Sequence, residues 1–398
     1  MSGARPTICL CMIVKNEVGV LARCLRSCRD LIDRWVICDT GSSDGTQELI
    51  ARELEGIPGE LYQHGWVDFG HNRSALMELA AGRADYLLLI DADMTVVQSA
   101  PLVGLTADAY MLRQGDERFD YRNKRLVRGD LRWRYVGVTH EYLSCLDVER
   151  TVERLDALVI DDHGDGGSKA DKFERDRALL KAELREHPDN ARAMFYLAQT
   201  QRDLGTQTGD IGALAAARDL YEWRAGMGGW EEEVCCAWRQ AGRLSAELGE
   251  WPRASAAFLA AWEARPSRLE AVHDLVAGLL DRRHHRTAHR FTALAAGVGG
   301  LAVPEDILFL EPWVYRWGLL FQHSVAAYWC GEFDASIRAC KRLLAIESLP
   351  DAHRHQAEVN MQLAFSQKAR QAVERMRMPA CTPRRLAHAG TPTRGRPA

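Results

Sequence analysis

The stretch DYLLLIDAD, residues 85–93, decides the fold because it has the pattern of a buried strand that ends in charge. Its aliphatic residues do not alternate with polar ones, which favours a strand of a parallel sheet with both faces covered. Asp91 and Asp93 then stand one residue apart where this strand is predicted to end. Ligands of open parallel sheets bind beyond the carboxyl ends of the strands. The sequence therefore predicts a binding site at Asp91 and Asp93.

Three further apolar runs precede this stretch, and helical patterns lie between them. The predicted strands cover residues 7–14, 34–40 and, more weakly, 60–66, and the predicted helices cover 18–33, 45–56 and 72–83. Strands that alternate with helices predict an α/β fold, in which helices cover both faces of a mostly parallel sheet.

Polar residues also follow the first two predicted strands. Lys15, Asn16 and Glu17 follow the first strand, and Asp39 opens the segment DTGSSDGT, residues 39–46, after the second. That segment alone could be a turn with a helix cap, because Ser, Asp and Thr all cap helices. Three polar groups at neighbouring strand ends instead favour one shared site.

Paired carboxylates suit a hard divalent cation. Mg²⁺ and Mn²⁺ take one or two carboxylates from a protein and complete their shell with water and phosphate oxygens. Such an ion can neutralise a diphosphate leaving group. The sequence contains neither G-x-x-x-x-G-K-[ST] nor G-x-G-x-x-G, which argues against a P-loop and a dinucleotide fold.

These segments together resemble family 2 glycosyltransferases of the GT-A fold. The resemblance rests on MIVKNE (12–17), VICDTGSSDGTQELI (36–50) and FGHNRSALMELAAGRADYLLLIDAD (69–93), in this order. Later segments, RWRYVGVTHEYL (132–143), GGWEEEV (228–234) and residues 310–344, resemble the subgroup that carries a tetratricopeptide-like helical domain. The sublancin-type peptide S-glycosyltransferases have this architecture.

The resemblance implies a nucleotide-sugar donor, an Mn²⁺ or Mg²⁺ ion and a role for each matching residue. Asp39 would hydrogen-bond the nucleotide base, and Asp91 would lie near the ribose and the metal. Asp93 would bind the metal directly, and His163, which follows an apolar run, would be a third ligand. The remaining nucleotide-sugar-binding residues would be Lys15, Asn16, Glu17, Gly41, Asp44 and Arg73.

His140 and Glu141 form the last polar group of interest. An inverting transferase needs a base within hydrogen-bond reach of the acceptor. Glu141 is the first candidate and His140 the second, and the alternative is that the pair orders a loop over the sugar. The acceptor implied by the subgroup is a peptide side chain, such as a Cys thiolate, and a glycan is the alternative.

The pattern becomes helical after about residue 171. Residues 249–266 place Gly249, Ala254, Phe258, Ala261 and Pro266 at the spacing of the second half of a tetratricopeptide repeat. Residues 331–344 and 188–205 match more loosely, and the alternative is a generic helical bundle. A helical array would suit an extended acceptor or a second copy of the chain.

We therefore expect a catalytic domain at 1–168, a tetratricopeptide-like domain at 169–372 and a disordered basic tail at 373–398. The tail is predicted from its Pro- and Arg-rich composition.

Composition argues against several other classes of protein. The net charge of −4 argues against a nucleic-acid partner, and no apolar run approaches the ~20 residues of a membrane helix. The first residues lack the pattern of a signal peptide, so we expect a cytoplasmic protein whose 11 cysteines are mostly buried thiols. Two rival functions are a haloacid dehalogenase-type phosphatase, with Asp91 as nucleophile, and a non-enzymatic helical scaffold.

Overall fold

The chain divides into two compact units. The first comprises Met1–Arg265 and Asp306–Phe309, and the second Pro266–Glu305 and Leu310–Ala398. The computed structural model describes residues 5–115, 120–148, 150–166, 172–293, 297 and 301–377. The predicted boundary between residues 168 and 169 lies inside the first unit, which therefore holds the sheet and several helices together.

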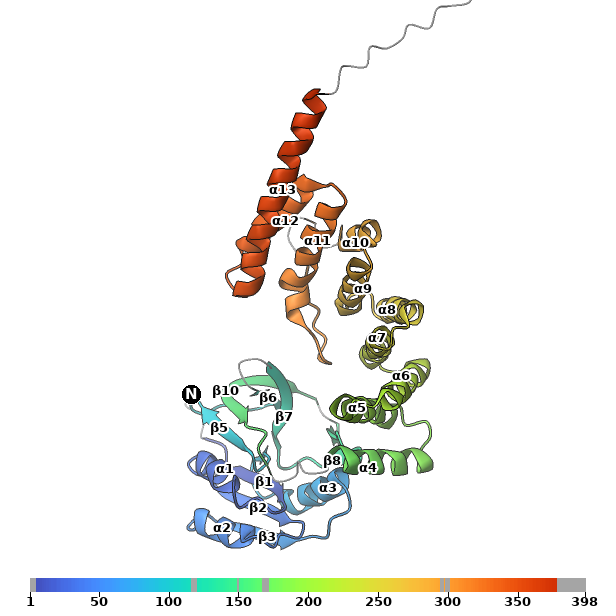
Figure 1. Ribbon diagram of the computed structural model, residues 1–398. Helices are drawn as coiled ribbons and strands as arrows, with labels where there is room; N and C mark the ends of the chain where they lie inside the picture. Colours follow the sequence, from blue (N-terminus) through green and yellow to red (C-terminus); the bar gives the residue numbers. More distant parts are fainter. Residues whose placement is uncertain are drawn as a thin grey trace, which may run out of the picture. The chain divides into compact units, whose positions relative to one another are not determined.

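An eight-stranded mixed sheet forms the centre of the first unit (Figure 1). Its order is β3 (Gly59–Gln63), β2 (Arg34–Asp39), β1 (Ile8–Val14), β4 (Tyr86–Leu89), β7 (Asp120–Arg128), β6 (Ala109–Gly115), β10 (Val152–Asp162) and β5 (Met94–Gln98). The first four strands are parallel, as their sequence pattern predicts. β7 is antiparallel to both of its neighbours, and β5 is antiparallel to β10. A separate hairpin joins β8 (Trp133–Val136) and β9 (Tyr142–Cys145).

Helices cover both faces of the parallel part of the sheet (Figure 1). Successive side chains of a strand point to opposite faces. Even-numbered residues of β1 pack with α1 (Leu21–Cys28) and α2 (Thr46–Glu53), whereas Cys9 and Cys11 pack with α3 (Phe69–Ala80). Both faces of β1 are therefore buried, which explains its continuous apolar run. The cysteines of this region are buried free thiols, as predicted.

The rest of the described chain is helical. In the first unit these helices are α4 (Lys172–Glu186), α5 (Ala191–Thr208), α6 (Ile211–Gly226), α7 (Glu231–Glu247) and α8 (Trp251–Ala264). The second unit contains α9 (Glu270–Asp281), α10 (His285–Thr292), a π-helical turn η3 (Val314–Gly318), α11 (Leu319–Trp329), α12 (Phe333–Leu344) and α13 (Asp351–Arg377).

The predicted repeat segments fall on helices with the expected packing. In α8 the small residues Ala254 and Ala261 are fully buried on either side of Phe258, which is 2% exposed. A Cβ on Gly242 of α7 would lie 2.6 Å from the Phe258 ring, so α7 and α8 approach closely at this point. The looser matches coincide with α5 and α12, which confirms the helical-repeat prediction.

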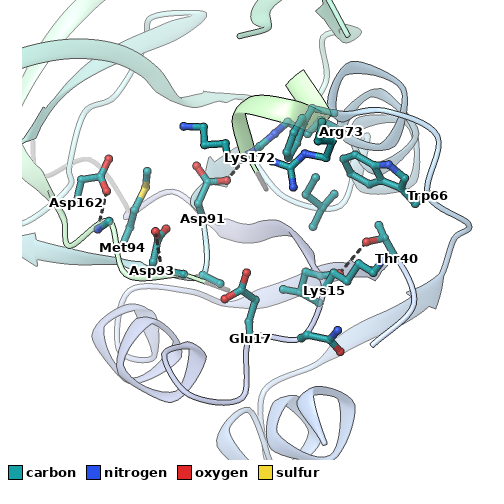
Figure 2. A pocket seen from close by; sticks show the side chains of 18 residues that line it. Lys15, Glu17, Thr40, Trp66, Arg73, Asp91, Asp93, Met94, Asp162 and Lys172 are labelled. Carbon is teal, nitrogen blue, oxygen red and sulfur yellow. Dashed lines mark hydrogen bonds and ion pairs between the residues drawn. The ribbon is translucent and has the colours of Figure 1, made fainter. Parts of the chain in front are cut away.

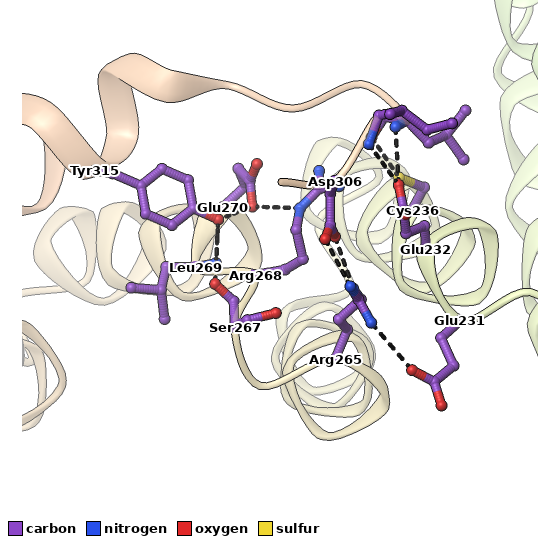
Figure 3. Close-up of polar contacts among 12 residues, drawn as sticks. Glu231, Glu232, Cys236, Arg265, Ser267, Arg268, Leu269, Glu270, Asp306 and Tyr315 are labelled. Atoms are coloured by element: carbon purple, nitrogen blue, oxygen red, sulfur yellow. Dashed lines mark hydrogen bonds and ion pairs between the residues drawn. The ribbon is translucent and has the colours of Figure 1, made fainter. Parts of the chain in front are cut away.

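A network of ion pairs explains why 306–309 belong to the first unit (Figure 3). Arg265 holds Asp306 through two bonds of 2.7 and 2.6 Å and reaches Glu231 at 3.1 Å. The Glu232 carboxylate accepts hydrogen bonds from the backbone N–H groups of residues 307 and 308, each at 2.9 Å.

The predicted tail lies mostly beyond the described residues. α13 continues through Arg377, past the predicted start at residue 373, and residues 378–398 lie outside the described part. In the described part no helix is both long and apolar enough to span a membrane.

Candidate functional site

A cavity of about 700 Å³ opens where β1 and β4 end (Figure 2). This is the edge at which open α/β sheets bind ligands. Its wall combines carboxylates, cations and aromatic rings. The lining residues include Lys15, Asn16, Glu17, Trp66, Phe69, Arg73, Asp91, Asp93, Asp162, Gly166, Lys172 and Arg175.

Hydrogen bonds join the loop after β1 to the loop after β2. The Asn16 backbone N–H donates to Ser42 Oγ at 2.9 Å, and the Asn16 side chain accepts from the Ser43 N–H at 2.9 Å. Asn16 has φ of 55°, a left-handed conformation that asparagine tolerates better than most residues. The Val18 N–H donates to Asp44 at 3.1 Å. The structure thus brings Lys15, Asn16 and Glu17 to the cavity wall.

Asp39, Gly41 and Asp44 lie behind this wall and are not among the residues that line the cavity. Asp39 is 1% exposed and accepts hydrogen bonds from Ser42 and Gln47. Asp44 accepts from the Thr46 hydroxyl and N–H at the start of α2, at 2.6 and 3.1 Å. The N-cap residue of α2 is Gly45, which has no side-chain cap, so Asp44 holds the turn that leads into the helix.

Two arginines hold Asp91 at the floor of the cavity. Arg73 of α3 hydrogen-bonds one Asp91 oxygen, and Arg125 Nη1 of β7 lies 3.3 Å from the other. Burial acts to raise the pKa of Asp91, but Arg73 and Arg125 outweigh burial and lower it to about 2. Asp91 is therefore a carboxylate at neutral pH, already balanced by protein cations.

The same Arg73 also reaches Glu141. Its Nε lies 2.8 Å from Glu141 Oε1, and both side chains are 13% exposed. Arg73 thus connects the first catalytic candidate to Asp91.

The second catalytic candidate, His140, is held by helix α5. Its ring stacks on Tyr196 with centroids 4.1 Å apart, and Arg192 donates to its backbone carbonyl at 2.7 Å. Burial, followed by the charges of Lys172 and Arg192, lowers the pKa of His140 to about 4. His140 is therefore neutral at pH 7, the form in which an imidazole can accept a proton.

The sequence predicts that the candidate metal ligands lie together, but in the structure they do not form one group. Among the described residues, no three His, Cys, Asp or Glu side chains form a group that could hold a metal ion. Asp93 lines the cavity, and one of its oxygens accepts from the Gly166 N–H at 3.2 Å. His163 is exposed, and its Nε2 lies 2.9 Å from the Thr95 hydroxyl. Of these two candidates, Asp93 lines the cavity, whereas His163 contacts Thr95.

Several lining residues have no counterpart in the sequence prediction. Trp66 and Phe69 lie just before and at the start of α3, and Asp162 ends β10. Lys172 and Arg175 come from the first turn of α4, beyond the predicted end of the catalytic domain. A basic first turn of a helix is normally read as a solvated surface, so no sequence signal pointed to this pair.

Comparison with known proteins identifies the amino-terminal part. Residues 9–100 match the family model described as glycosyl transferase family 2. These residues form a family 2 glycosyltransferase domain. The match covers β1 to β5 and the cavity residues from Lys15 to Asp93, and it supports a role in glycosyl transfer. Glu141, His163 and Lys172 lie beyond the matched residues.

One curated protein is similar to about half of this chain. A TPR repeat-containing protein of Synechococcus elongatus is 30% identical over 234 residues, which cover 54% of this chain and 56% of that protein. The chain thus spans about half the length of this curated relative.

Two solved structures are similar at lower identity. MamA is 15% identical, with a TM-score of 0.33 over 53% of this chain and 98% of MamA. S. aureus TarS is 11% identical, with a TM-score of 0.34 over 62% of this chain and 54% of TarS. Both TM-scores lie below 0.5, so neither likeness supports an argument about this chain. The glycosyltransferase domain is followed by a tetratricopeptide-like helical region, as the repeat pattern predicts.

Proposed function

We propose that the chain transfers a sugar from a nucleotide-diphosphate sugar, in the first instance a UDP-sugar, to an acceptor. The observation that carries the proposal is the cavity at the ends of β1 and β4, which lies in a family 2 glycosyltransferase domain and is lined by Asp91, Asp93 and cations. Its volume of about 700 Å³ suits a ligand of this size. The reaction proposed is an inverting displacement at the anomeric carbon, with the diphosphate as leaving group.

The nucleoside end of the proposed donor site is formed by the loops after β1 and β2. Lys15, Asn16 and Glu17 would flank the nucleoside, with Trp66 offering a ring face (Figure 2). Asp39 is the proposed partner of the base, and Gln47 and Ser42 orient its carboxylate. Gly41, at φ of 109°, and Asp44 keep this loop in its shape.

We propose Mn²⁺ or Mg²⁺ as the cofactor, because a divalent ion would neutralise the charge that develops on the leaving diphosphate. Asp93 is the proposed protein ligand, since the Gly166 N–H is the only hydrogen-bond donor to its carboxylate among the described residues. Asp91 would act mainly by holding Arg73 and Arg125 at the floor of the site. His163 remains the proposed third ligand, which requires its ring to exchange Thr95 for the ion.

Glu141 is the proposed general base. Its carboxylate lies in the same charged cluster as Asp91, linked through Arg73. A proton from the acceptor would pass to this carboxylate as the acceptor atom attacks. His140 is the alternative base: its ring is neutral at pH 7, but burial and neighbouring cations lower its pKa to about 4 and make it a weaker proton acceptor than an ordinary histidine.

The acceptor proposed is a peptide side chain, with a glycan as the alternative, and the helical repeats would present an extended surface to it. Self-association through the helical region is a related proposal that light scattering of the purified chain would test. The name of the curated relative mentions only the repeats, so a non-enzymatic scaffold is the second candidate.

Calorimetry and turnover assays separate these two functions. UDP should bind in the presence of Mn²⁺ and more weakly with chelator, and a screen of UDP-sugars with the full-length chain should reveal slow donor hydrolysis. Asp93→Ala should abolish turnover, whereas Asp156→Ala, which removes an 80% exposed carboxylate, should not. Equal UDP affinity with and without metal would remove the metal from the proposal. Donor binding without turnover would favour the scaffold.

A further inference from the structure

The first turn of helix α4 reaches the donor cavity. Lys172 and Arg175 line the cavity together with Asp91 and Arg73, although α4 belongs to the helical part of the chain. Both residues lie outside the stretch that matches the glycosyltransferase family model. The cavity therefore contains two cations that come from a helix outside the matched domain.

Packing holds α4 against the catalytic domain. The Arg175 guanidinium lies over the Phe69 ring, 5.2 Å from its centroid. Asp176, which is 2% exposed, lies close enough to Thr139, in the segment between β8 and β9, for Thr139 to act on its pKa. The first turn of α4 is thus fixed to two separate parts of the glycosyltransferase side, and Lys172 takes its position from these contacts.

The cations around the cavity differ in their partners. Arg73 is paired with Asp91 and Glu141, and Arg125 is shared between Asp91 and Gln114. Lys172 is exposed, and among the described residues it forms no ion pair, although its charge acts on Asp176 one turn along α4. A cation that lines a cavity without a carboxylate partner attracts anions to that cavity. A lysine ammonium is a common point-charge ligand for phosphate.

We propose that Lys172 binds phosphate oxygens of the donor's diphosphate, so that the first helix of the helical part completes the donor site. This inference rests on the proposed function. Arg175 is a positioning residue in this arrangement, because its contact with Phe69 fixes the turn from which Lys172 extends. The helical part would then contribute to donor binding as well as to any recognition of the acceptor.

Calorimetry on the full-length chain tests the proposal with two probes, inorganic pyrophosphate and UDP. Lys172→Ala should weaken binding of both by about 10-fold or more, the effect of losing one hydrogen bond to a charged group. Lys172→Arg should restore most of the affinity. Lys181→Ala is the matched control, because it removes the same charge from an exposed position farther along α4 and should leave both affinities unchanged. Uridine should bind equally to all four proteins.

The outcomes distinguish this inference from the proposed function. Pyrophosphate binding that depends on Lys172 supports the inference even if no nucleotide sugar is turned over, in which case only the proposed function fails. UDP binding and sugar transfer that are the same in Lys172→Ala and the wild type overturn the inference and leave the proposed function in place. Equal losses in Lys172→Ala and Lys181→Ala also overturn it, since they would reflect the overall charge of the helix. Failure of the wild type to bind either probe contradicts both.

Discussion

Replacing Asp91 with Asn should destabilise the sheet-containing unit at neutral pH by an amount that the two arginines determine. The pKa of Asp91 falls from 3.8 to about 2 because Arg73 and Arg125 outweigh the effect of burial. Each pKa unit corresponds to about 1.4 kcal/mol, so the ionised form is favoured by about 2 kcal/mol on folding. With 23% of the side chain exposed, solvent screening does not remove this effect. The amide of the variant would keep the shape of the side chain and lose its charge.

The pH dependence follows from the direction of the pKa change. A carboxyl whose folded pKa lies below its unfolded value stabilises the fold above the unfolded pKa, and this contribution is lost as pH falls towards the folded pKa. The difference between wild type and Asp91→Asn should therefore be full at pH 7 and about half as large at pH 3. Differential scanning calorimetry at both values, which resolves the transitions of separate units, measures it.

A surface pair provides the control for this prediction. Asp130 is paired with Arg128 but 59% exposed, so Asp130→Asn should change stability by less than about 1 kcal/mol. Equal melting of wild type and Asp91→Asn at pH 7 would refute the claim that the arginines stabilise the ionised carboxyl. A difference that stays constant down to pH 3 would show that its origin is packing rather than charge.

Four further predictions concern the loops and the helical part. Gly70→Ala should destabilise the fold by about 1–3 kcal/mol in urea titrations, because its Cβ would lie 2.1 Å from the Gly137 carbonyl oxygen. Glu141→Gln should slow transfer to a hydroxyl acceptor by about 10²-fold and transfer to a thiol much less, since a thiol ionises near pH 8.5 without help. His163→Ala should weaken Mn²⁺ activation, measured by metal titration, more than it lowers the melting temperature. A chain that ends at Phe309, and so keeps the Asp306–Phe309 segment of the first unit, should keep UDP affinity and lose acceptor glycosylation, as measured by mass spectrometry.

Matched control variants distinguish these specific effects from nonspecific destabilisation of the fold. Gly65→Ala adds a Cβ with no atom within 4 Å and should be neutral. Glu153→Gln and His187→Ala change exposed residues of the same types and should leave rate and metal titration unchanged. Full acceptor activity in the shortened chain would contradict a role in acceptor recruitment for the part of the second unit that follows Phe309. An unchanged metal titration in His163→Ala would remove that residue from the proposed ligand set.

The parallel half of the fold could be predicted because its signals are local. β1, β2 and β4 are apolar runs that end at polar loops, and their burial on both faces leaves little choice of structure. β7 could not be recognised in this way, since DYRNKRLVR reads as a charged surface segment. It lies between β4 and β6 in the sheet, where Arg125 is directed to Asp91. The charge of Arg125 is paired with Asp91, which is 34 residues away in the sequence and comes close only in the folded chain.

The candidate site shows the same division between local and long-range information. Lys15, Asn16, Glu17, Arg73, Asp91 and Asp93 follow strand ends or begin a helix, and the structure brings all six to one cavity. Lys172 and Arg175 reach that cavity because α4 packs against the sheet-containing part. In the sequence, α4 begins where the strand–helix pattern gives way to helices, a change that suggests a domain boundary. The local pattern thus predicted the edge of the sheet at which the cavity opens, whereas the wall contributed by α4 depends on tertiary packing.

The position of Arg73 determines how variants of the two carboxylates have to be interpreted. Because Arg73 contacts both Asp91 and Glu141, removing either carboxylate leaves the guanidinium with the other one. The rate of Glu141→Gln would therefore combine the loss of the proposed base with a change at the floor of the cavity. Residues that share a partner are not additive, and a double-mutant cycle isolates their coupling. If Glu141 acts only as a base, its loss should cost the same factor whether residue 91 is Asp or Asn. A cost that depends on residue 91 would instead show that Arg73 couples Asp91 energetically to Glu141.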